Sequence, residues 1–390
     1  MQSKLASLGH ASHKRAMGHA FEIGGIAVAR GTRQRIALPI SHTLTGLSAN
    51  LMLEVVHGAT DGPTVFVSAA IHGDEIAGTA IIQRLIPRID AAQLAGTIIL
   101  APAVNIYGFI AQSRYLPDRR DLNRSFPGNP NGSLASQLAH CFFENVICRS
   151  TLGIDLHSAA VHRYNLPQVR IAAGDERLIE LATVFGAPII IESPLREGSM
   201  RQLAHERGTP MLLLEAGEAL RFDRFSTEVG TRGVLRVLAH IGMLPGDDAM
   251  ANVPAPSRSN RTRWVRAPRG GVSHRLRKSG DSVTRGEVLA RVGGVFGEDC
   301  RDVISPIDGI VIGHATLPVV YQGDAMFHIA EVEHPERAGE RIASLDFAIH
   351  AKEPAGPARP LMDEDEVEEM EADGEDTDAE ASAKAARTPL

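Results

Sequence analysis

The sequence predicts an α/β domain, with a mixed sheet flanked by helices, followed by a small all-β domain. Three observations predict this fold class. Within residues 24–246, short apolar runs rich in β-branched residues alternate with amphipathic segments, as they do where strands and helices alternate along a chain. Residues 247–263 are rich in Pro, Ser and Asn without periodicity, which is typical of a linker. Residues 264–331 contain an approximate internal repeat of short strand-like segments.

The elements of the first domain follow from local patterns. Residues 24–57 alternate polar and apolar positions, which predicts strands. The run TVFVSAAI at residues 64–71 suits a strand buried on both faces. Further strands are predicted at residues 96–105, 153–160 and 209–217, and helices at residues 76–89, 133–149, 176–186 and 231–244. In such a sheet, ligands bind beyond the C-terminal ends of the strands.

After the linker the chain contains two similar halves, and further segments lie at its two ends. Residues 267–292 and 305–330 each open with Pro and Gly and contain a Gly-Glu or Gly-Asp turn before an apolar strand. These halves resemble those of a biotinyl/lipoyl-like domain and should interlock as a small barrel or sandwich. Residues 354–390 are too charged to bury a core, so we expect disorder there. Residues 1–23 are interpreted as a flexible extension.

The net charge of −7 arises from the acidic tail. Residues 363–390 hold twelve acidic residues against Lys384 and Arg387, a local balance of −10. The rest of the chain therefore carries about +3, which is near neutral for its size and argues against a nucleic-acid-binding protein. No stretch reaches the roughly 18 apolar residues that a membrane span requires.

The three cysteines are Cys141, Cys148 and Cys300. Their number is odd and no two have the CxxC spacing, which argues against a disulfide framework and against a thiolate zinc site. We interpret them as reduced structural thiols. Together with the lack of an apolar leader segment, they favour a cytoplasmic location.

A His-x-x-Glu motif follows the buried strand at residues 64–71. The motif occurs four times in the chain, but only His72 and Glu75 lie in a Gly-containing turn between a buried strand and a helix. His157 ends another apolar strand at the same edge of the sheet. Two histidines and one glutamate are a known ligand set of catalytic zinc, which keeps a fourth position open. The sequence therefore predicts one zinc ion per chain at His72, Glu75 and His157.

Hydrolysis at such a site needs a carboxylate that accepts a proton from the attacking water. Glu215 follows four apolar residues at the end of a predicted strand. A charge in that position is costly to desolvate unless it is used or paired. Glu215 is therefore the candidate general base, and Glu218, three residues on, is the alternative.

The segment RYLPDRRDLNRSFPG supplies candidate substrate ligands. Asn123 and Arg124 form an amide–guanidinium pair suited to a carboxylate, because a guanidinium donates two parallel hydrogen bonds. Arg114 lies in a loop from which it could polarise the attacked carbonyl oxygen. Arg119 and Arg120 are interpreted as solvated loop charges.

Four motifs occur in a fixed order: HGDE at residues 72–75, DLNR-x-FPG at residues 121–128, DLH at residues 155–157 and LEAGE at residues 214–218. Together they resemble the aspartoacylase/succinylglutamate desuccinylase family, relatives of the zinc carboxypeptidases. The resemblance covers the region from about residue 20 to residue 331. It implies a zinc carboxypeptidase-like fold, a C-terminal β domain that limits access to the active site, and zinc-dependent deacylation of a small N-acyl amino acid. N-succinylglutamate, N-acetylaspartate and N-acetyl-diaminobutyrate are all compatible substrates.

The resemblance also implies roles for individual residues. His72, Glu75 and His157 match the zinc ligands, Glu215 the general base, Asn123 and Arg124 the carboxylate-binding pair, and Arg114 the carbonyl-polarising arginine. Arg163 and Arg170, which follow the strand of His157, are the next candidates for binding the substrate carboxylate. The only expected partners are a small-molecule substrate and, as an open possibility, further copies of the chain.

Three other functions compete with this one. A zinc carboxypeptidase acting on peptide C-termini would use the same residues, but a peptide needs an open groove and the β domain is expected to obstruct it. A carrier module would need a lysine at the turn between the two β halves, and that turn reads VGGVFGEDCRD. An inactive scaffold is disfavoured because every residue type that the reaction needs is present.

Overall fold

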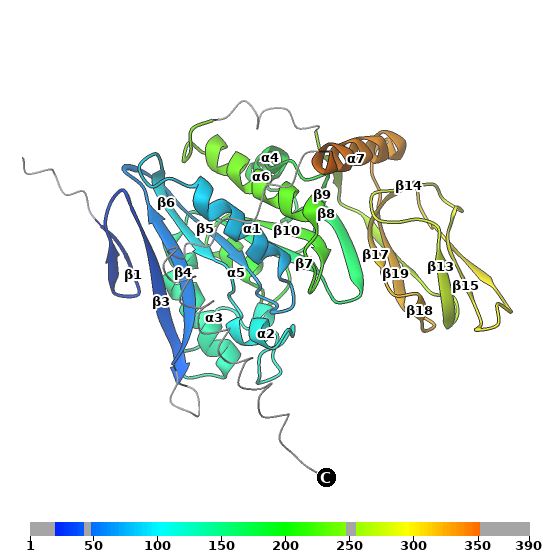
Figure 1. The fold of residues 1–390 in the computed structure, drawn as a ribbon, viewed down its shortest axis with the longest axis horizontal. Helices are drawn as coiled ribbons and strands as arrows, with labels where there is room; N and C mark the ends of the chain where they lie inside the picture. Colours follow the sequence, from blue (N-terminus) through cyan, green and yellow to red (C-terminus); the bar gives the residue numbers. More distant parts are fainter. Residues whose placement is uncertain (1–19, 43–47, 247–254, 352–390) are drawn as a thin grey trace, which may run out of the picture. The chain divides into compact units, whose positions relative to one another are not determined.

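The computed structural model describes residues 20–42, 48–246 and 255–351. A 13-stranded mixed sheet runs through this part of the chain, with helices on both faces (Figure 1). Its main path is, in spatial order, β12 (Thr262–Arg266), β19 (Ala325–Ala330), β17 (Gly309–Ala315), β8 (Arg163–Ile171), β10 (Met211–Glu218), β7 (Leu152–Ala159), β5 (Thr60–Ala69), β6 (Ala95–Ala101), β4 (Ser48–His57) and β3 (Thr32–His42). Off this path, β9 (Ile189–Glu192) pairs with β8, β11 (Ser257–Ser259) with β9, and β14 (Ser282–Val283) with β17.

Two smaller sheets accompany the large one. β1 (Phe21–Ile23) and β2 (Ile26–Val28) form a hairpin. A four-stranded sheet comprises β16 (Arg301–Ile304), β15 (Val288–Gly293), β13 (Gly271–Arg275) and β18 (Val319–Val320), in that order. The predicted α/β class with a small C-terminal all-β part is therefore confirmed.

The four central strands, β10, β7, β5 and β6, run parallel to one another. Their residues are almost all buried, which explains why they read as continuous apolar runs in the sequence. Outside this centre, β4, β3, β17, β19 and β12 join the sheet in antiparallel pairs. The sheet therefore has a parallel centre, in which the C-terminal ends of the strands lie at one edge, and antiparallel strands on both sides of that centre.

Helices pack against both faces of the sheet. One face is covered by α1 (Ala77–Leu85), α4 (Glu176–Phe185), α6 (Arg224–His240) and α7 (Pro335–His350). The other face is covered by α3 (Leu134–Asn145) and α5 (Met200–Glu206) (Figure 1). The remaining helical segments are α2 (Ile106–Ile110), η1 (Ile86–Arg88), η2 (Leu122–Arg124) and η3 (Ile147–Arg149).

The side chains of β7 alternate between the two faces of the sheet. Leu152, Ile154 and Leu156 enter the core beneath α1, α4 and α6. Asp155 and His157 therefore point to the opposite face, because successive side chains on a strand alternate. We call this opposite face, on which α3 and α5 lie, the polar face of the sheet.

Several boundaries differ from the expectations above. β1 begins at Phe21, inside the segment interpreted as an extension, and residues 1–19 lie outside the described chain. The predicted linker lies partly outside it, and its second part contains β11, which pairs with β9. Helix α7 was not predicted; it mixes polar and apolar residues in equal number and contains Gly339, so its pattern is weak. The expected acidic tail lies outside the described residues.

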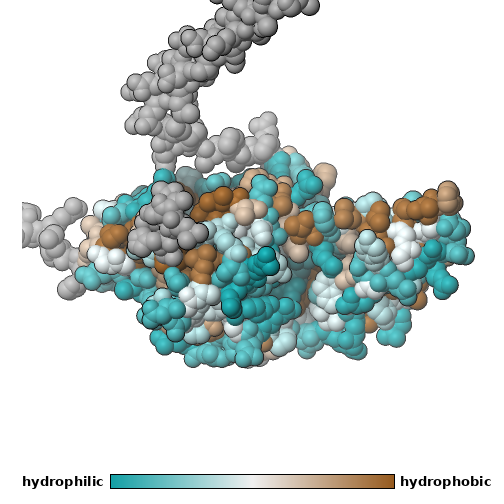
Figure 2. Space-filling view, turned by 90° about the horizontal axis from the view of Figure 1, so that it is seen from below, coloured by the Kyte–Doolittle hydropathy of each residue, from teal (hydrophilic) through white to brown (hydrophobic). Residues whose placement is uncertain are grey.

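Figure 2 shows one face of the molecular surface. On the face drawn in Figure 2, hydrophilic residues predominate and apolar residues form separate small groups. No helix in the described ranges combines the length and the apolar character that crossing a membrane requires. The three cysteines form no disulfide, and Cys148 and Cys300 are exposed.

Close packing of α1 on the sheet gives a first prediction. A Cβ on Gly78 would lie 2.7 Å from the Cβ atoms of Ala69 and Leu156 and 2.9 Å from the Leu156 carbonyl oxygen. Gly78→Ala should therefore lower the free energy of unfolding by about 1–3 kcal/mol, although alanine favours a helix by about 1 kcal/mol. Urea unfolding measures the loss. The exposed Gln83→Ala on the same helix is the control, and an equal effect of both would contradict close packing.

Candidate metal centre and active site

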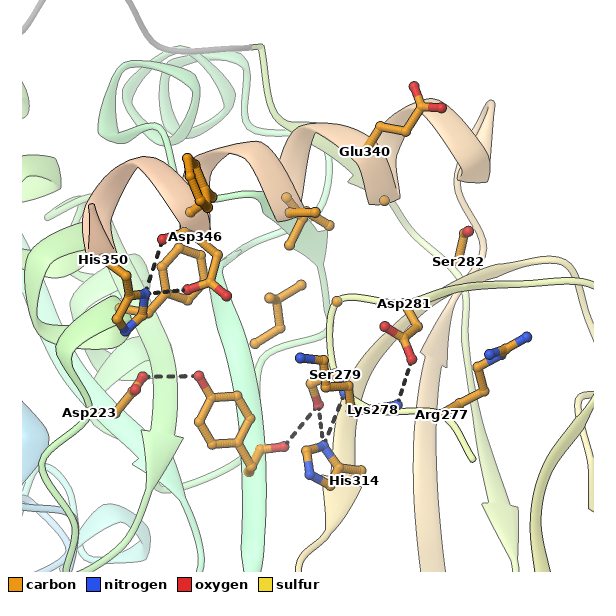
Figure 3. Close-up of a pocket in the computed structure, with 18 of the residues that line it drawn as sticks. Asp223, Arg277, Lys278, Ser279, Asp281, Ser282, His314, Glu340, Asp346 and His350 are labelled. Atoms are coloured by element: carbon orange, nitrogen blue, oxygen red, sulfur yellow. Dashed lines mark hydrogen bonds and ion pairs between the residues drawn. The ribbon is translucent and has the colours of Figure 1, made fainter. Parts of the chain in front are cut away.

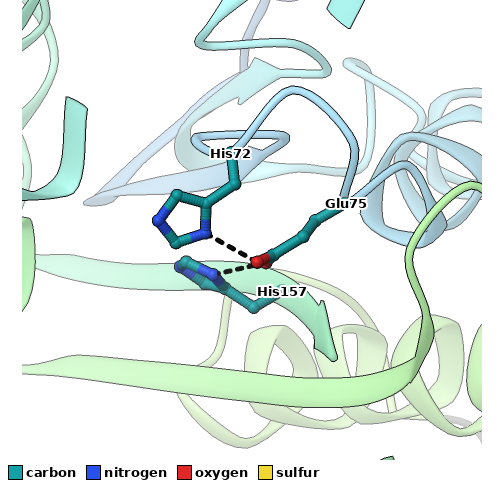
Figure 4. A group of neighbouring side chains, drawn as sticks. All are labelled: His72, Glu75 and His157. Carbon is teal, nitrogen blue, oxygen red and sulfur yellow. Dashed lines mark hydrogen bonds and ion pairs between the residues drawn. The ribbon is translucent and has the colours of Figure 1, made fainter. Parts of the chain in front are cut away.

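Three side chains converge beyond the C-terminal ends of two parallel strands. His72 follows β5, His157 lies near the end of β7, and Glu75 lies in the turn that leads into α1. One ligand atom from each lies within 4.8 Å of the other two. The Glu75 carboxylate bridges the imidazoles, with each oxygen 2.7 Å from one Nδ1 (Figure 4). All three are at most 4% exposed, so the group is buried.

A second layer of carboxylates orients both imidazoles. Asp155 Oδ2 lies 2.7 Å from His157 Nε2, and the other carboxylate oxygen, Oδ1, accepts a hydrogen bond from Ser68 Oγ at 2.7 Å. Asp121 Oδ1 lies 3.3 Å from His72 Nε2. Because a carboxylate binds an N–H, His157 Nε2 carries a proton toward Asp155, and in both imidazoles Nδ1 faces Glu75. This is the arrangement in which a histidine offers its other nitrogen to a metal ion.

The electrostatics of the group also favour a cation. Burial by itself lowers the pKa of His157, but the carboxylates of Asp155 and Glu75 outweigh burial and hold that pKa well above its usual value. Burial raises the pKa of Glu75, yet the two imidazoles hold it well below its usual value. Protons on the two Nδ1 atoms therefore occupy the positions that a divalent cation would take. The donor set fits a metal ion with two nitrogen ligands and one oxygen ligand.

Glu215 lies beside the metal ligands on the neighbouring strand. Its Cα is the partner of the His157 Cα in the parallel pairing of β10 with β7, so both side chains point to the polar face. Asn165 Nδ2 donates to Glu215 Oε2 at 2.9 Å, and Arg170 Nε lies 3.8 Å from Oε1. The side chain is about one-fifth exposed, so water and a small molecule can reach it.

Glu218 has a different surrounding. Its Oε1 accepts hydrogen bonds from the backbone N–H of His162 at 3.1 Å and from Thr316 Oγ1 at 3.0 Å. These contacts join the loop after β7 to the C-terminal β part. Glu218 is therefore placed to hold two segments together, whereas Glu215 is placed at the metal group.

Arg114 is the arginine that the structure brings to the metal group. Its Nη1 donates to Glu75 Oε1 at 3.3 Å and its Nη2 donates to Asp121 Oδ2 at 3.0 Å. By contrast, Arg119 and Arg120 are exposed, and Arg120 lies 3.9 Å from Asp118. Arg114 thus lies beside the metal group, in contact with Glu75.

Asn123 and Arg124 lie in the short helical turn η2. The Asn123 side chain is buried, and its Oδ1 accepts from the backbone N–H of Met200 at 2.9 Å, which leaves its amide N–H groups as donors. Arg124 is exposed; its Nη1 donates to the Asn123 carbonyl oxygen. Its side chain lines a cavity of about 520 Å³ together with Phe126 and Pro127. Arg124 therefore presents its guanidinium at a surface recess, whereas Asn123 is buried and does not line that recess.

The two later arginine candidates lie in different surroundings. Arg163 Nη1 donates to the Ala325 carbonyl oxygen at 3.3 Å, and its guanidinium lies 5.7 Å from the centre of the Trp264 ring. It is held by β19 and β12, so the structure places it at the C-terminal β part. Arg170 lies next to Glu215, as described above. Their predicted role in binding substrate stays a prediction.

Sequence reasoning missed several polar residues of this region. Asp121 and Asp155 belong to the DLNR and DLH motifs, and their place two residues before a candidate ligand was the available signal. Gln168 and His328 are 0% and 4% exposed on the same face of the sheet. Nothing in the local sequence indicates them, because a pairing of distant strands brings them there.

Comparison with known proteins identifies similar sequences. Residues 61–241 match the family described as the succinylglutamate desuccinylase/aspartoacylase catalytic domain. The chain is 29% identical over 316 residues to N-alpha-acetyl-L-2,4-diaminobutyric acid deacetylase of Halomonas elongata, an alignment that covers 76% of this chain and 90% of that protein.

Two solved structures are similar over most of their length. One is a succinylglutamate desuccinylase/aspartoacylase from Rhodobacter sphaeroides, with 27% identity, a TM-score of 0.69, and coverage of 77% of this chain and 96% of that chain. The other is the ectoine utilization protein EutE of Ruegeria pomeroyi, solved with product bound, with 25% identity, a TM-score of 0.70, and coverage of 78% and 97%. Residues 61–241 of this chain belong to the succinylglutamate desuccinylase/aspartoacylase family.

Proposed function

We propose that this protein is a zinc-dependent amidohydrolase that removes the acyl group from a small N-acyl amino acid. The observation that carries the proposal is the group of His72, Glu75 and His157, with each imidazole oriented by a carboxylate. Two nitrogen ligands and one oxygen ligand are the protein ligands of several hydrolytic zinc sites. The deacetylase from Halomonas elongata, which matches over most of its length, supports the same reaction class.

Each nearby residue has a chemical task in this proposal. When bound, a zinc ion polarises the amide carbonyl and lowers the pKa of water. Glu215 accepts a proton from the attacking water and later delivers it to the leaving amine. Arg114 donates hydrogen bonds to the oxygen on which negative charge develops. Asn123 and Arg124 hold the carboxylate of the amino acid, which fixes the amide relative to Glu215.

A zinc carboxypeptidase remains the alternative, because it would use the same groups. The C-terminal strands favour the small-molecule reaction. β17 pairs with β8 beside Asn165, and that residue donates to Glu215. We propose that the β domain, residues 264–331, limits access to the site and so excludes extended peptides.

Three other expectations stay predictions. We propose one zinc ion per chain, a cytoplasmic location, and a small molecule as the substrate. Self-association of the chain is left open.

A substrate panel tests the function. Purified full-length protein loaded with zinc should release free amino acid from at least one of N-acetylaspartate, N-succinylglutamate and N-acetyl-diaminobutyrate. It should cleave a peptide C-terminus at least about 10²-fold less efficiently if the β domain excludes extended chains as proposed. Efficient release of C-terminal residues from peptides would instead support the carboxypeptidase.

The carboxylate clamp gives a further prediction. Lysine keeps the charge of Arg124 but cannot donate two parallel hydrogen bonds. Arg124→Lys should therefore lower kcat/KM by about 10-fold or more, from the lost charge-assisted hydrogen bond. Wild-type protein should prefer the free acid over the corresponding amino acid amide, and Arg124→Ala should lose most of that preference. A variant that still discriminates like the wild type would show that the carboxylate is bound elsewhere.

A further inference from the structure

A cavity of about 930 Å³ lies on the face of the sheet that carries α6 and α7 (Figure 3). It is enclosed by α7, by the turn at residues 277–282 between β13 and β14, and by the strands β8 and β17. The metal ligands and Glu215 do not line it. Its volume is within the range of about 300–1,000 Å³ that is typical of small-molecule sites, which often lie between two parts of a chain.

Apolar and aromatic side chains form the base of the cavity. Leu166, Phe225 and Ile342 line it and are each at most 6% exposed. Beside them lie the rings of Tyr164 and His314, with their centres 5.6 Å apart. Burial and two nearby cations lower the pKa of His314 to about 3, and burial raises the pKa of Tyr164, so both rings are neutral near pH 7. The base therefore offers contact area without charge.

One wall of the cavity presents a cation without a partner. The Lys278 N–H donates to Asp281 Oδ2 at 2.8 Å and the Asp281 N–H donates to the Lys278 carbonyl oxygen at 3.1 Å, which fixes the turn. In Figure 3 the Lys278 side chain points into the cavity, whereas Arg277, which pairs with Glu287, points away from it. Among the described residues, Lys278 Nζ has no hydrogen-bond or ion-pair partner. Its charge adds to the effect of burial on the pKa of His314, so the ammonium group lies near that ring.

Gly280 allows this turn to approach α7. Its φ is +101°, a conformation that side chains disfavour. A Cβ at this position would lie 3.2 Å from Ile342 Cγ2 and 3.7 Å from Leu166 Cδ1. The turn that carries Lys278 is therefore packed directly against the helix on the other side of the cavity.

Helix α7 presents a carboxylate to the same cavity. Asp346 lies four residues after Ile342 and three before Ile349, so it shares the helix face on which both isoleucines are buried. A charge on an inward face is costly unless it is paired or used. Asp346 Oδ1 lies 2.9 Å from His350 Nδ1, but Oδ2 has no such partner among the described residues. Burial is the main cause of the raised pKa of Tyr164 and the charge of Asp346 adds to it, so the carboxylate lies near that phenol.

The other charged groups of the lining are already engaged or turned away. Asp223 Oδ2 accepts a hydrogen bond from the Tyr164 hydroxyl at 2.9 Å. Asp281 holds the turn, as described above, and the carboxylate of Glu340 points away from the other labelled side chains (Figure 3). The cavity thus keeps one free cation and one free carboxylate. They lie at the two ends of a pair of neighbouring neutral rings, within reach of one small molecule.

We propose that this cavity binds a free amino acid with an apolar side chain. Lys278 binds the carboxylate of the ligand, Asp346 binds its ammonium group, and the apolar base contacts its side chain. A third charge on the ligand would have no free partner, which disfavours acidic and basic amino acids. The inference goes beyond the proposed function and does not depend on it. An N-acyl amino acid lacks the ammonium group, so this site and the metal centre would select different molecules.

Equilibrium dialysis of the full-length protein with radiolabelled L-leucine tests the ligand class. Leucine should bind with a Kd of about 1 mM or below, as expected for a ligand of this size. As unlabelled competitors, 4-methylpentanoate lacks only the amino group of leucine and 3-methylbutylamine lacks only its carboxylate. Each should compete at least about 10-fold more weakly than leucine, because one charge-assisted contact is lost. Glycine, L-glutamate and L-lysine should also compete weakly.

Variants assign the binding to the cavity. Lys278→Met should weaken leucine binding by about 10-fold or more, and so should Asp346→Asn. Lys278 is exposed, so its replacement should leave the melting temperature unchanged. Arg277→Met is the matched control: it removes the neighbouring cation, which points away from the cavity, and should bind leucine like the wild type. Glu215→Gln should also keep wild-type binding, because Glu215 lies on the polar face.

Several outcomes would overturn this inference. One is the absence of leucine binding at about 10 mM, ten times the expected Kd. Another is competition by 4-methylpentanoate or 3-methylbutylamine as strong as that by leucine. Binding that Lys278→Met leaves unchanged, or that Glu215→Gln abolishes, would place leucine elsewhere. None of these results bears on deacylation, which the substrate panel tests separately.

Discussion

Removal of zinc is expected to abolish hydrolysis, with a loss of about 10³-fold or more in kcat, because the ion lowers the pKa of water by several units. Protein dialysed against a chelator should be inactive, and one equivalent of zinc should restore it. Elemental analysis of protein purified without chelator should give one zinc ion per chain. A fully active protein without metal would contradict the mechanism.

The second layer of carboxylates provides an internal control for zinc binding. Asp155→Asn leaves the three ligands in place but removes the charge beside His157 Nε2. Changes of this kind lower metal affinity by about 10–100-fold. The variant should therefore lose zinc at lower chelator concentrations than the wild type, and excess zinc should restore most of its activity. If its zinc affinity were unchanged, Asp155 would have only a structural role.

Glu215→Gln is expected to lower kcat by about 10²-fold or more while zinc content stays at one ion per chain, because the change removes the proton acceptor and nothing else. The amide can still accept the hydrogen bond that Asn165 donates. Steady-state kinetics and elemental analysis on the same preparation separate loss of chemistry from loss of metal.

Glu218→Gln is the matched control, three residues along the same strand. Glu218 accepts hydrogen bonds from His162 and Thr316, so its replacement should affect stability more than turnover. A melting temperature lower by a few degrees, with kcat within about 3-fold of the wild type, would agree with this role. If Glu218→Gln lost turnover and Glu215→Gln did not, the assignment of the general base would be reversed.

Much of the sheet that carries the site could be predicted, because local sequence patterns specify its strands. The run at residues 64–71 and the strand before His157 are apolar on both sides, which is typical of buried parallel strands. Their parallel pairing brings their C-terminal ends together, so His72, Glu75 and His157 could be grouped before any coordinates. Arg114 could be proposed from its place in the loop before the DLNR motif and from the family resemblance.

The positions that could not be predicted depend on pairing between strands that lie far apart in the sequence. The alternation of β8 suggests that Asn165 should point away from Gln168, yet a shift of register between β8 and β10 puts both on the polar face. A bulge of this kind has no clear sequence signature here. His328 reaches the same face only because β17 pairs with β8 and β19 pairs with β17. The local sequence around His328 does not indicate this position.

The continuous sheet also has a consequence for dissecting the molecule. β17 pairs with β8 along Arg163, Tyr164 and Asn165. A chain shortened to residues 1–246 would lose this partner and present the free N–H and carbonyl groups of β8 to the solvent. Exposed edges of this kind pair with one another and lead to aggregation. The C-terminal strands therefore cover an edge that would otherwise pair with other chains. We expect residues 1–246 alone to aggregate.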